Sequence, residues 1–140
     1  MASGIRDVRQ FGVTESRLRE LAGQAWPVRE NASVIGHTKV GCALLTTNGN
    51  CFVGCNVEHQ FRCHDVHAEI NAITTMLASG ERRFTLIVIV AERDRFTPCG
   101  GCMDWIMQFG GSECTIVFQG ARGGDVQIHT ARELMPFYPQ

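Results

Sequence analysis

The stretch Phe84-Thr85-Leu86-Ile87-Val88-Ile89-Val90-Ala91 indicates the fold class. It is apolar and rich in β-branched residues without alternation, which is typical of a central strand covered on both faces. A helix is expected at Cys99–Phe109, between Pro98 and Gly110-Gly111, and a second strand at Cys114–Gln119. Strand, helix and strand in this order form a βαβ unit, which requires a parallel pair and a right-handed crossover.

Further elements flank this unit. Apolar residues at helical spacing predict a helix from Thr14 and Glu15 to near Trp26, where Pro27 would end it. Two strands are expected at Lys39–Thr46 and Cys51–Val57, joined by a tight turn at Asn48-Gly49. A helix is expected at His67–Ala78, a short strand at Val126–His129 and a helical turn at Thr130–Leu134. Asp65 would cap the helix that begins near His67. The predicted class is α/β, with helices on both faces of a mixed sheet of about five strands.

Length and composition narrow the class of protein. A chain of 140 residues suits one domain, 1–140, and is too short for two ordinary ones. With 44% hydrophobic and 19% charged residues it has a globular composition, and no apolar run approaches the roughly 18 residues of a membrane span. Met1–Gln10 lacks the apolar core of a secretion signal, so we expect a cytoplasmic protein without membrane contact.

Charge and cysteine content limit the partners. The formal net charge is −1 and the basic residues are scattered, which disfavours a polynucleotide and favours a small, roughly neutral substrate. The seven cysteines are odd in number, so thiols and metal ligation are expected rather than a disulfide framework.

Two short motifs carry the predicted chemistry, His67-Ala68-Glu69 and Pro98-Cys99-Gly100-Gly101-Cys102. One imidazole and two thiolates leave a tetrahedral zinc ion one open position, which distinguishes a catalytic site from a closed structural one. Their charges also balance a divalent ion. Glu69 is not needed as a ligand and is the predicted general acid/base. Together, H-x-E and P-C-x-x-C form the known signature of zinc deaminases.

Both motifs are expected at helix amino termini, whose partial positive charge favours thiolate over thiol. Other interpretations remain open for the motif Cys99-x-x-Cys102 taken alone. It could be a redox pair, or half of a structural zinc site in a noncatalytic, zinc-stabilised binding module. Candidates for the fourth ligand of such a module are Cys51, Cys55, Cys63 and His64. The catalytic interpretation is favoured because the two motifs occur together and no fourth ligand lies at motif spacing.

Three further segments extend the pattern. Gly54-Cys55-Asn56-Val57-Glu58 resembles the G-C-N-V-E segment of the cytidine deaminase family, and the eleven-residue step from Asn56 to His67 is also that of the family. The segments 40–45 and 133–137 are similar to its V-G-A-A-L strand and its E-L-L-P segment. The resemblance covers about residues 36–137.

This resemblance implies a three-layer α/β/α fold and hydrolytic deamination of cytidine or deoxycytidine to the uridine counterpart and ammonia, with one zinc ion per chain. Short members of the family are usually homotetramers whose active sites are completed across subunits; a dimer is the alternative. By the same resemblance Asn56 and Glu58 hold the ribose 3′-hydroxyl, and Ala68 is a further substrate-binding residue.

Several positions depart from the family pattern. His67 replaces a cysteine ligand, while Ile70 and Met103 stand where short members carry arginines near the metal. Thr38 replaces a phenylalanine that packs near the base, and residues 59–62 replace N-A-S-Y. The predicted pocket therefore includes residues of altered type: Thr38, His59, Phe61, Arg62 and, as an aromatic lid, Phe137. The altered pocket leaves a second class of substrate open, namely another amino-heterocycle such as a modified nucleoside, a nucleoside antibiotic such as blasticidin S, or a free base.

Overall fold

The computed structural model describes residues 6–139. Five strands form one mixed sheet in the order β2-β1-β3-β4-β5. Their bounds are Gly41–Thr46 for β1, Cys51–Cys55 for β2, Phe84–Val90 for β3, Thr115–Gln119 for β4 and Val126–Thr130 for β5. Strand β1 pairs antiparallel with β2 and β3, β3 pairs parallel with β4, and β4 pairs antiparallel with β5. The predicted hairpin and the predicted parallel pair are both confirmed.

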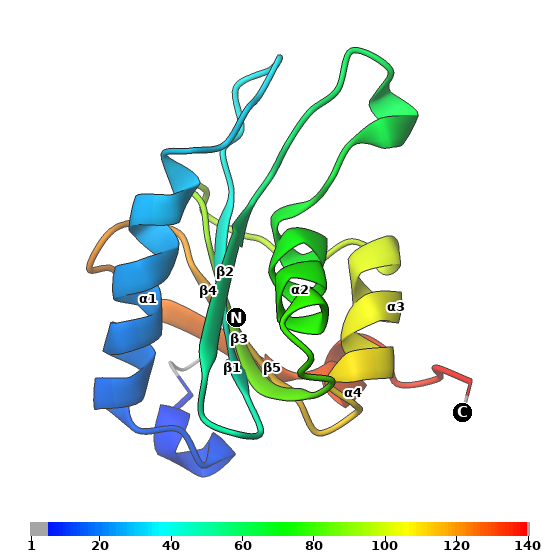
Figure 1. Ribbon diagram of the computed structural model, residues 1–140. Coiled ribbons are helices and arrows are strands. Elements are labelled where there is room, and N and C mark those ends of the chain that lie inside the picture. The colour runs from blue at the N-terminus through cyan, green and yellow to red at the C-terminus, as the bar shows by residue number, and fades with distance from the viewer. Residues whose placement is uncertain (1–5, 140) are drawn as a thin grey trace.

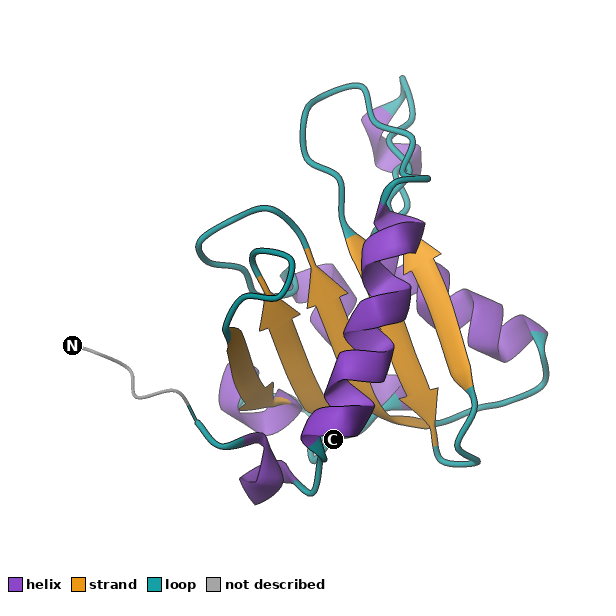
Figure 2. Ribbon diagram, turned by 90° about the vertical axis from the view of Figure 1, so that its left-hand side faces the viewer, coloured by secondary structure: helices purple, strands orange, loops and turns teal. Residues whose placement is uncertain are grey.

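Helices cover both faces of the sheet (Figures 1 and 2). Helix α1 (Glu15–Arg29) lies across one face, and α2 (Ala68–Ala78) and α3 (Gly100–Phe109) cover the other. Shorter helical segments are η1 (Val8–Phe11), η2 (Arg62–His64) and α4 (Ala131–Leu134). The predicted three-layer α/β class is confirmed. No helix within residues 6–139 is long and apolar enough to cross a membrane.

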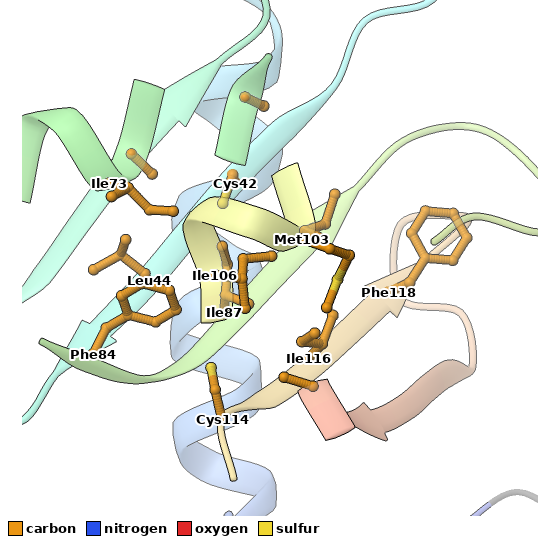
Figure 3. Close-up of a cluster of buried hydrophobic side chains, with 14 of the residues drawn as sticks. Cys42, Leu44, Ile73, Phe84, Ile87, Met103, Ile106, Cys114, Ile116 and Phe118 are labelled. Carbon is orange, nitrogen blue, oxygen red and sulfur yellow. The ribbon is translucent and has the colours of Figure 1, made fainter. Parts of the chain in front are cut away.

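Strand β3 shows why its sequence is apolar without alternation. Ile87 and Ile89 pack with residues of α2 and α3, whereas Leu86, Val88 and Val90 pack with residues of α1. Each of these side chains is at most 2% exposed, because both faces of the strand are covered. Figure 3 shows the cluster beneath α2 and α3, where Ile87 lies among Leu44, Phe84 and Ile106.

Two predicted helix signals are wrong. Pro27 lies inside α1, which continues to Arg29. Pro27 lacks the N–H that would bond the Gly23 carbonyl, but only two further residues follow it in the helix, and the Arg29 side chain donates to the Lys39 carbonyl at 3.0 Å. Asp65 does not cap α2, because its carboxylate instead accepts hydrogen bonds from the His59 N–H at 2.7 Å and from Arg62 at 2.9 Å. The N-cap residue of α2 is His67.

The first two strands are shorter than predicted. Strand β1 begins at Gly41 rather than at Lys39, and β2 ends at Cys55 rather than at Val57. The Val40 N–H bonds the side-chain oxygen of Asn56 at 2.8 Å, so a side chain takes the place of a ladder partner at this edge. The segment before β1 and the segment after β2 are therefore loops, and both rise above the sheet in Figure 1.

Candidate metal and substrate site

Three ligand-type side chains meet where α2 and α3 begin. Both helices start at the same end of the layer (Figure 1), and their N-cap residues are His67 and Cys99. The His67 Nδ1 lies 3.2 Å from the Cys102 Sγ and 3.4 Å from the Cys99 Sγ. Within residues 6–139 these three form the one group of at least three metal-ligating side chains, with ligand atoms within 4.8 Å of one another.

The distances fit a tetrahedral zinc ion. Zn–N and Zn–S bonds of about 2.0 and 2.3 Å place tetrahedral nitrogen and sulfur ligands about 3.5 Å apart. The observed separations of 3.2 and 3.4 Å are close to that value. One imidazole and two thiols are also the donor types that zinc prefers. The ligand set can therefore hold zinc.

The two cysteines differ in environment. Cys99 is exposed and its Sγ accepts the Cys102 N–H at 3.4 Å, as a helix N-cap does. Cys102 is fully buried, and this burial, followed by the nearby Glu69 carboxylate, raises the pKa of its thiol far above the usual range. Burial thus opposes the thiolate form that the helix amino terminus favours. A divalent cation among the ligands would favour it.

Glu69 is the second residue of α2 and is 2% exposed. Burial raises the pKa of its carboxyl group, since a charged carboxylate is poorly stabilised away from water. A carboxyl group with a raised pKa exchanges protons more readily near neutral pH, which suits a general acid/base.

Close packing of β2 against α2 sets the position of this cluster. A Cβ atom on Gly54 would lie 2.4 Å from the Ala72 nitrogen and 2.6 Å from the Ala68 carbonyl oxygen. Only glycine allows this approach of strand to helix. The Asn71 side chain completes the contact by accepting the Cys55 N–H at 3.0 Å.

A cleft of about 470 Å³ opens beside the ligand cluster. Its lining includes the predicted catalytic residue Glu69 and two of the predicted metal ligands, His67 and Cys99. The three predicted substrate-binding residues also line it, Asn56, Glu58 and Ala68, as do two of the predicted pocket residues, Thr38 and Arg62. Cys102 lies beneath it as the buried third ligand-type residue.

Asn56 and Glu58 hold the neighbouring loop. The Asn56 amide donates to the Thr38 carbonyl at 2.9 Å and accepts the Val40 N–H at 2.8 Å. One Glu58 oxygen accepts the N–H groups of Ile35 and Gly36 at 2.7 and 2.8 Å. These backbone donors, with a smaller contribution from Arg62, lower the pKa of Glu58. The carboxylate therefore stays ionised at the cleft wall.

The remaining predicted pocket residues lie outside the cleft lining. His59 stacks on Phe61 with ring centroids 5.7 Å apart, and His64 contacts both rings at their edges. Phe61 is 61% exposed and Phe137 is 96% exposed. The structure thus brings Thr38 and Arg62 into the cleft, but not His59, Phe61 or Phe137.

Comparison with known proteins agrees with this geometry. Residues 15–118 match the family described as the cytidine and deoxycytidylate deaminase zinc-binding region. The chain belongs to this family. A crystal structure of cytidine deaminase from Burkholderia pseudomallei has a TM-score of 0.79 and 32% identity, covering 89% of this chain and 98% of that one. The zinc cofactor and the deaminase fold expected from the sequence are confirmed at the level of the family.

Two curated relatives show how far the likeness extends. A cytidine deaminase of Sporosarcina psychrophila is 28% identical over 121 residues, which are 85% of this chain and 88% of that protein. A Dictyostelium discoideum protein named as a probable cytidine deaminase is 39% identical over 83 residues, 58% of this chain. The matched segment spans 56% of the length of the Dictyostelium protein.

The composition of the ligand cluster distinguishes a three-ligand zinc site from the two alternatives, a closed structural zinc site and a redox pair of cysteines. Within residues 6–139 no fourth His, Cys or carboxylate joins the three ligand-type residues. Cys51 and Cys55 lie on β2, Cys63 lies exposed in η2, and all seven cysteines are free. The geometry thus favours a three-ligand deaminase site over a closed structural site or a disulfide pair.

Sequence reasoning missed one wall of the cleft. Residues Arg93, Arg95, Phe96 and Thr97 line it, and they belong to the segment that connects β3 to α3. The signal that points to them is topological, because ligands bind at the carboxyl ends of parallel strands. The segment follows β3, the first strand of the parallel pair, and immediately precedes Pro98.

Proposed function

We propose that this protein hydrolytically deaminates a cytidine-like nucleoside, cytidine or deoxycytidine, and releases the uridine counterpart and ammonia. The observation that carries the proposal is the buried Glu69 carboxyl group, which lies beside the three-ligand cluster at the base of an open cleft. Membership of the deaminase family supports the same reaction.

In this proposal His67, Cys99 and Cys102 hold zinc. When bound, zinc supplies Lewis acidity and lowers the pKa of water to about 7. Glu69 accepts a proton from the attacking water and delivers it to the ring nitrogen beside the reacting carbon. It then takes the second proton from the newly added hydroxyl group and gives it to the departing amine, so that a carbonyl group replaces the C–N bond and ammonia leaves.

The sugar would bind at the wall formed by Asn56 and Glu58, with Ala68 at the floor. Glu58 is suited to this role because it is ionised and can accept a hydroxyl hydrogen bond. Ala68 is 1% exposed and offers a small apolar contact at the start of α2. The nucleoside would thus be held at the sugar while its amine faces Glu69.

Substituting Glu69→Gln tests the mechanism. The amide keeps the size of the side chain but cannot exchange the proton, so we expect about one zinc per chain and a fall in kcat of about 10²- to 10⁴-fold. Metal analysis and ammonia release measure the two quantities. Glu113→Gln is the matched control, because Glu113 is exposed and pairs with Arg132 away from the cleft. A Glu69→Gln enzyme with full activity would refute the mechanism.

A different amino-heterocycle is the second candidate substrate, and the cleft wall favours considering it. Thr38 and Arg62, two positions that differ in type from the family pattern, both line the cleft. Rates of ammonia release from cytidine, modified cytosine nucleosides and free bases decide between the two classes. No turnover of cytidine, with turnover of another member of the set, would select the second candidate.

We further propose a homo-oligomer, a tetramer or alternatively a dimer, that acts on a small molecule and not on a polynucleotide. The resemblance to the short, usually homotetrameric members of the family supports self-association, and Ile35, Phe61 and Phe137 are exposed apolar side chains that a subunit contact could cover. Sedimentation analysis would give the subunit number. Seven cysteines without a disulfide are typical of proteins from a reducing compartment, which supports the expected cytoplasmic location.

A further inference from the structure

Two arginines of the β3–α3 segment line a cleft whose other charged side chains are one arginine, Arg62, and the carboxyl groups of Glu58, Asp65 and Glu69. Arg93 and Arg95 both line the cleft that contains His67, Glu69 and Cys99. The Arg93 guanidinium lies 5.7 Å from the centroid of the Phe96 ring, which lines the same cleft. Arginine side chains therefore border the site from the β3–α3 segment. Ile70 and Met103 occupy the two positions near the metal where the resembled short family members carry arginines.

The charged side chains that the 56–66 loop contributes to the cleft are already paired. Arg62 contacts Glu58 at 3.2 Å and Asp65 at 2.9 Å, so one cation is matched by two carboxylates. Among the ion pairs of residues 6–139, neither Arg93 nor Arg95 has a carboxylate partner. The two guanidinium groups thus remain available for an anion that enters the cleft.

The backbone that carries these arginines is tightly fixed. The Arg93 N–H bonds the carbonyls of Ala91 and Gly120 at 3.0 and 3.2 Å. A Cβ on Gly120 would lie 2.0 Å from the Arg93 carbonyl oxygen, so only glycine permits the approach. The Gln127 side chain also donates to the Asp94 carbonyl at 3.3 Å. The segment is therefore anchored to the end of β4 and to β5, which limits where the arginines can reach.

We propose that Arg93 and Arg95 bind an anionic group, a phosphate or a carboxylate, at the 5′ end of the sugar of the substrate. The proposal rests on the proposed function, which places the amine at Glu69 and the 3′-hydroxyl at Asn56 and Glu58. The 5′ substituent is then the part of a nucleoside left to face another wall. Guanidinium groups are well suited to phosphate and carboxylate because they can donate two parallel hydrogen bonds.

Binding to a protein that cannot turn over its ligand tests the proposal directly. In zinc-loaded Glu69→Gln protein, calorimetry compares the Kd of cytidine, cytidine 5′-monophosphate and cytidine 5′-carboxylate. We expect at least one anionic ligand to bind about tenfold more tightly than cytidine, the gain of one charge-assisted hydrogen bond. Adding Arg93→Gln and Arg95→Gln, singly and together, should progressively remove this preference.

Arg19→Gln is the matched control, because Arg19 is an exposed arginine on α1, across the sheet from α2 and α3. It should keep the preference for the anion, and thermal unfolding should show that every variant is folded. A gain for the phosphate alone assigns a nucleotide, and a gain for both anions assigns general anion recognition. Equal affinity for all three ligands, or a preference that survives the double substitution, would overturn the proposal.

Ammonia release from the enzyme with Glu69 intact separates this inference from the proposed function. Turnover of cytidine without any preference for an anion would leave the proposed function standing and remove the inference. Anion-dependent binding that requires both arginines, without turnover of any of the three ligands, would support the anion site and contradict cytidine-like deamination.

Discussion

The ligand cluster and the walls of the cleft are built in different ways. Cys102 and Glu69 are almost completely buried in helices that pack on the sheet, and their positions follow from the core. The walls come from the loops at 35–40, 56–66 and 92–97, which are held by side-chain hydrogen bonds and by ion pairs at the surface. Chemistry is therefore tied to the fold, whereas substrate choice depends on segments that can change without altering it.

The largest expected effect comes from breaking the ligand cluster itself. Cys102→Ser replaces a soft thiolate by a hydroxyl that binds zinc poorly, so we expect zinc content and deaminase activity to fall to background. Chelation of the metal should have the same effect, and added zinc should restore activity only in the parent protein. Metal analysis and ammonia release measure both.

Cys63→Ser controls for the loss of a thiol, because Cys63 is exposed in η2 and lies outside the ligand group. It should keep its zinc and its activity. Full zinc occupancy together with an unchanged rate in Cys102→Ser would mean that the cluster is not the catalytic metal site, and would leave the buried Glu69 without a role.

A smaller effect is expected where the core positions the cluster. Gly54→Ala would place a methyl group against the backbone of α2, which overpacks the contact and should lower the free energy of unfolding by about 1–3 kcal/mol. Because His67 and Glu69 begin that helix, kcat should fall as well. Denaturant unfolding and steady-state kinetics provide the two measurements.

Gly23→Ala is the matched substitution on the other face of the sheet. Gly23 lies inside α1 with no atom within 4 Å of an added Cβ, so alanine should leave kcat unchanged and should stabilise the helix by up to about 1 kcal/mol. Equal stability of the two alanine variants would show that the approach of β2 to α2 does not constrain the site.

The same division explains what the sequence could predict. The apolar run of β3 and the glycines and prolines around α3 are local signals, and they led to the correct class and the parallel pair. The two motifs could be joined because both begin helices on one layer. Pro27 and Asp65 misled because their effect depends on partners from elsewhere in the chain, Lys39 for the end of α1 and His59 for Asp65.

The cleft walls were predicted less completely for a similar reason. Asn56 and Glu58 could be named from a resemblance, but their hydrogen bonds to the 35–40 loop follow only from the fold. Arg93 and Arg95 carry no motif, and their place in the cleft depends on the anchoring of their loop at Gly120. Phe61 was expected in the pocket from the resemblance and Phe137 as an aromatic lid, although the structure places both on the surface of the chain.

The smallest predicted effect concerns a wall charge. Arg62→Gln removes a partner of Glu58, but the Ile35 and Gly36 N–H groups remain, and they are the larger cause of the lowered Glu58 pKa. We therefore expect the Glu58 pKa to rise slightly and to stay below its usual range, as followed by NMR titration of its carboxyl carbon. The stability contributed by Glu58 is then still present at neutral pH and is lost only as the pH falls through that lowered pKa.

Arg122→Gln, which loses a pair with Glu30 instead, should leave the titration of Glu58 unchanged. A return of the Glu58 pKa to the ordinary glutamate range in Arg62→Gln would show that the ion pair, rather than the loop backbone, sets the charge of this wall.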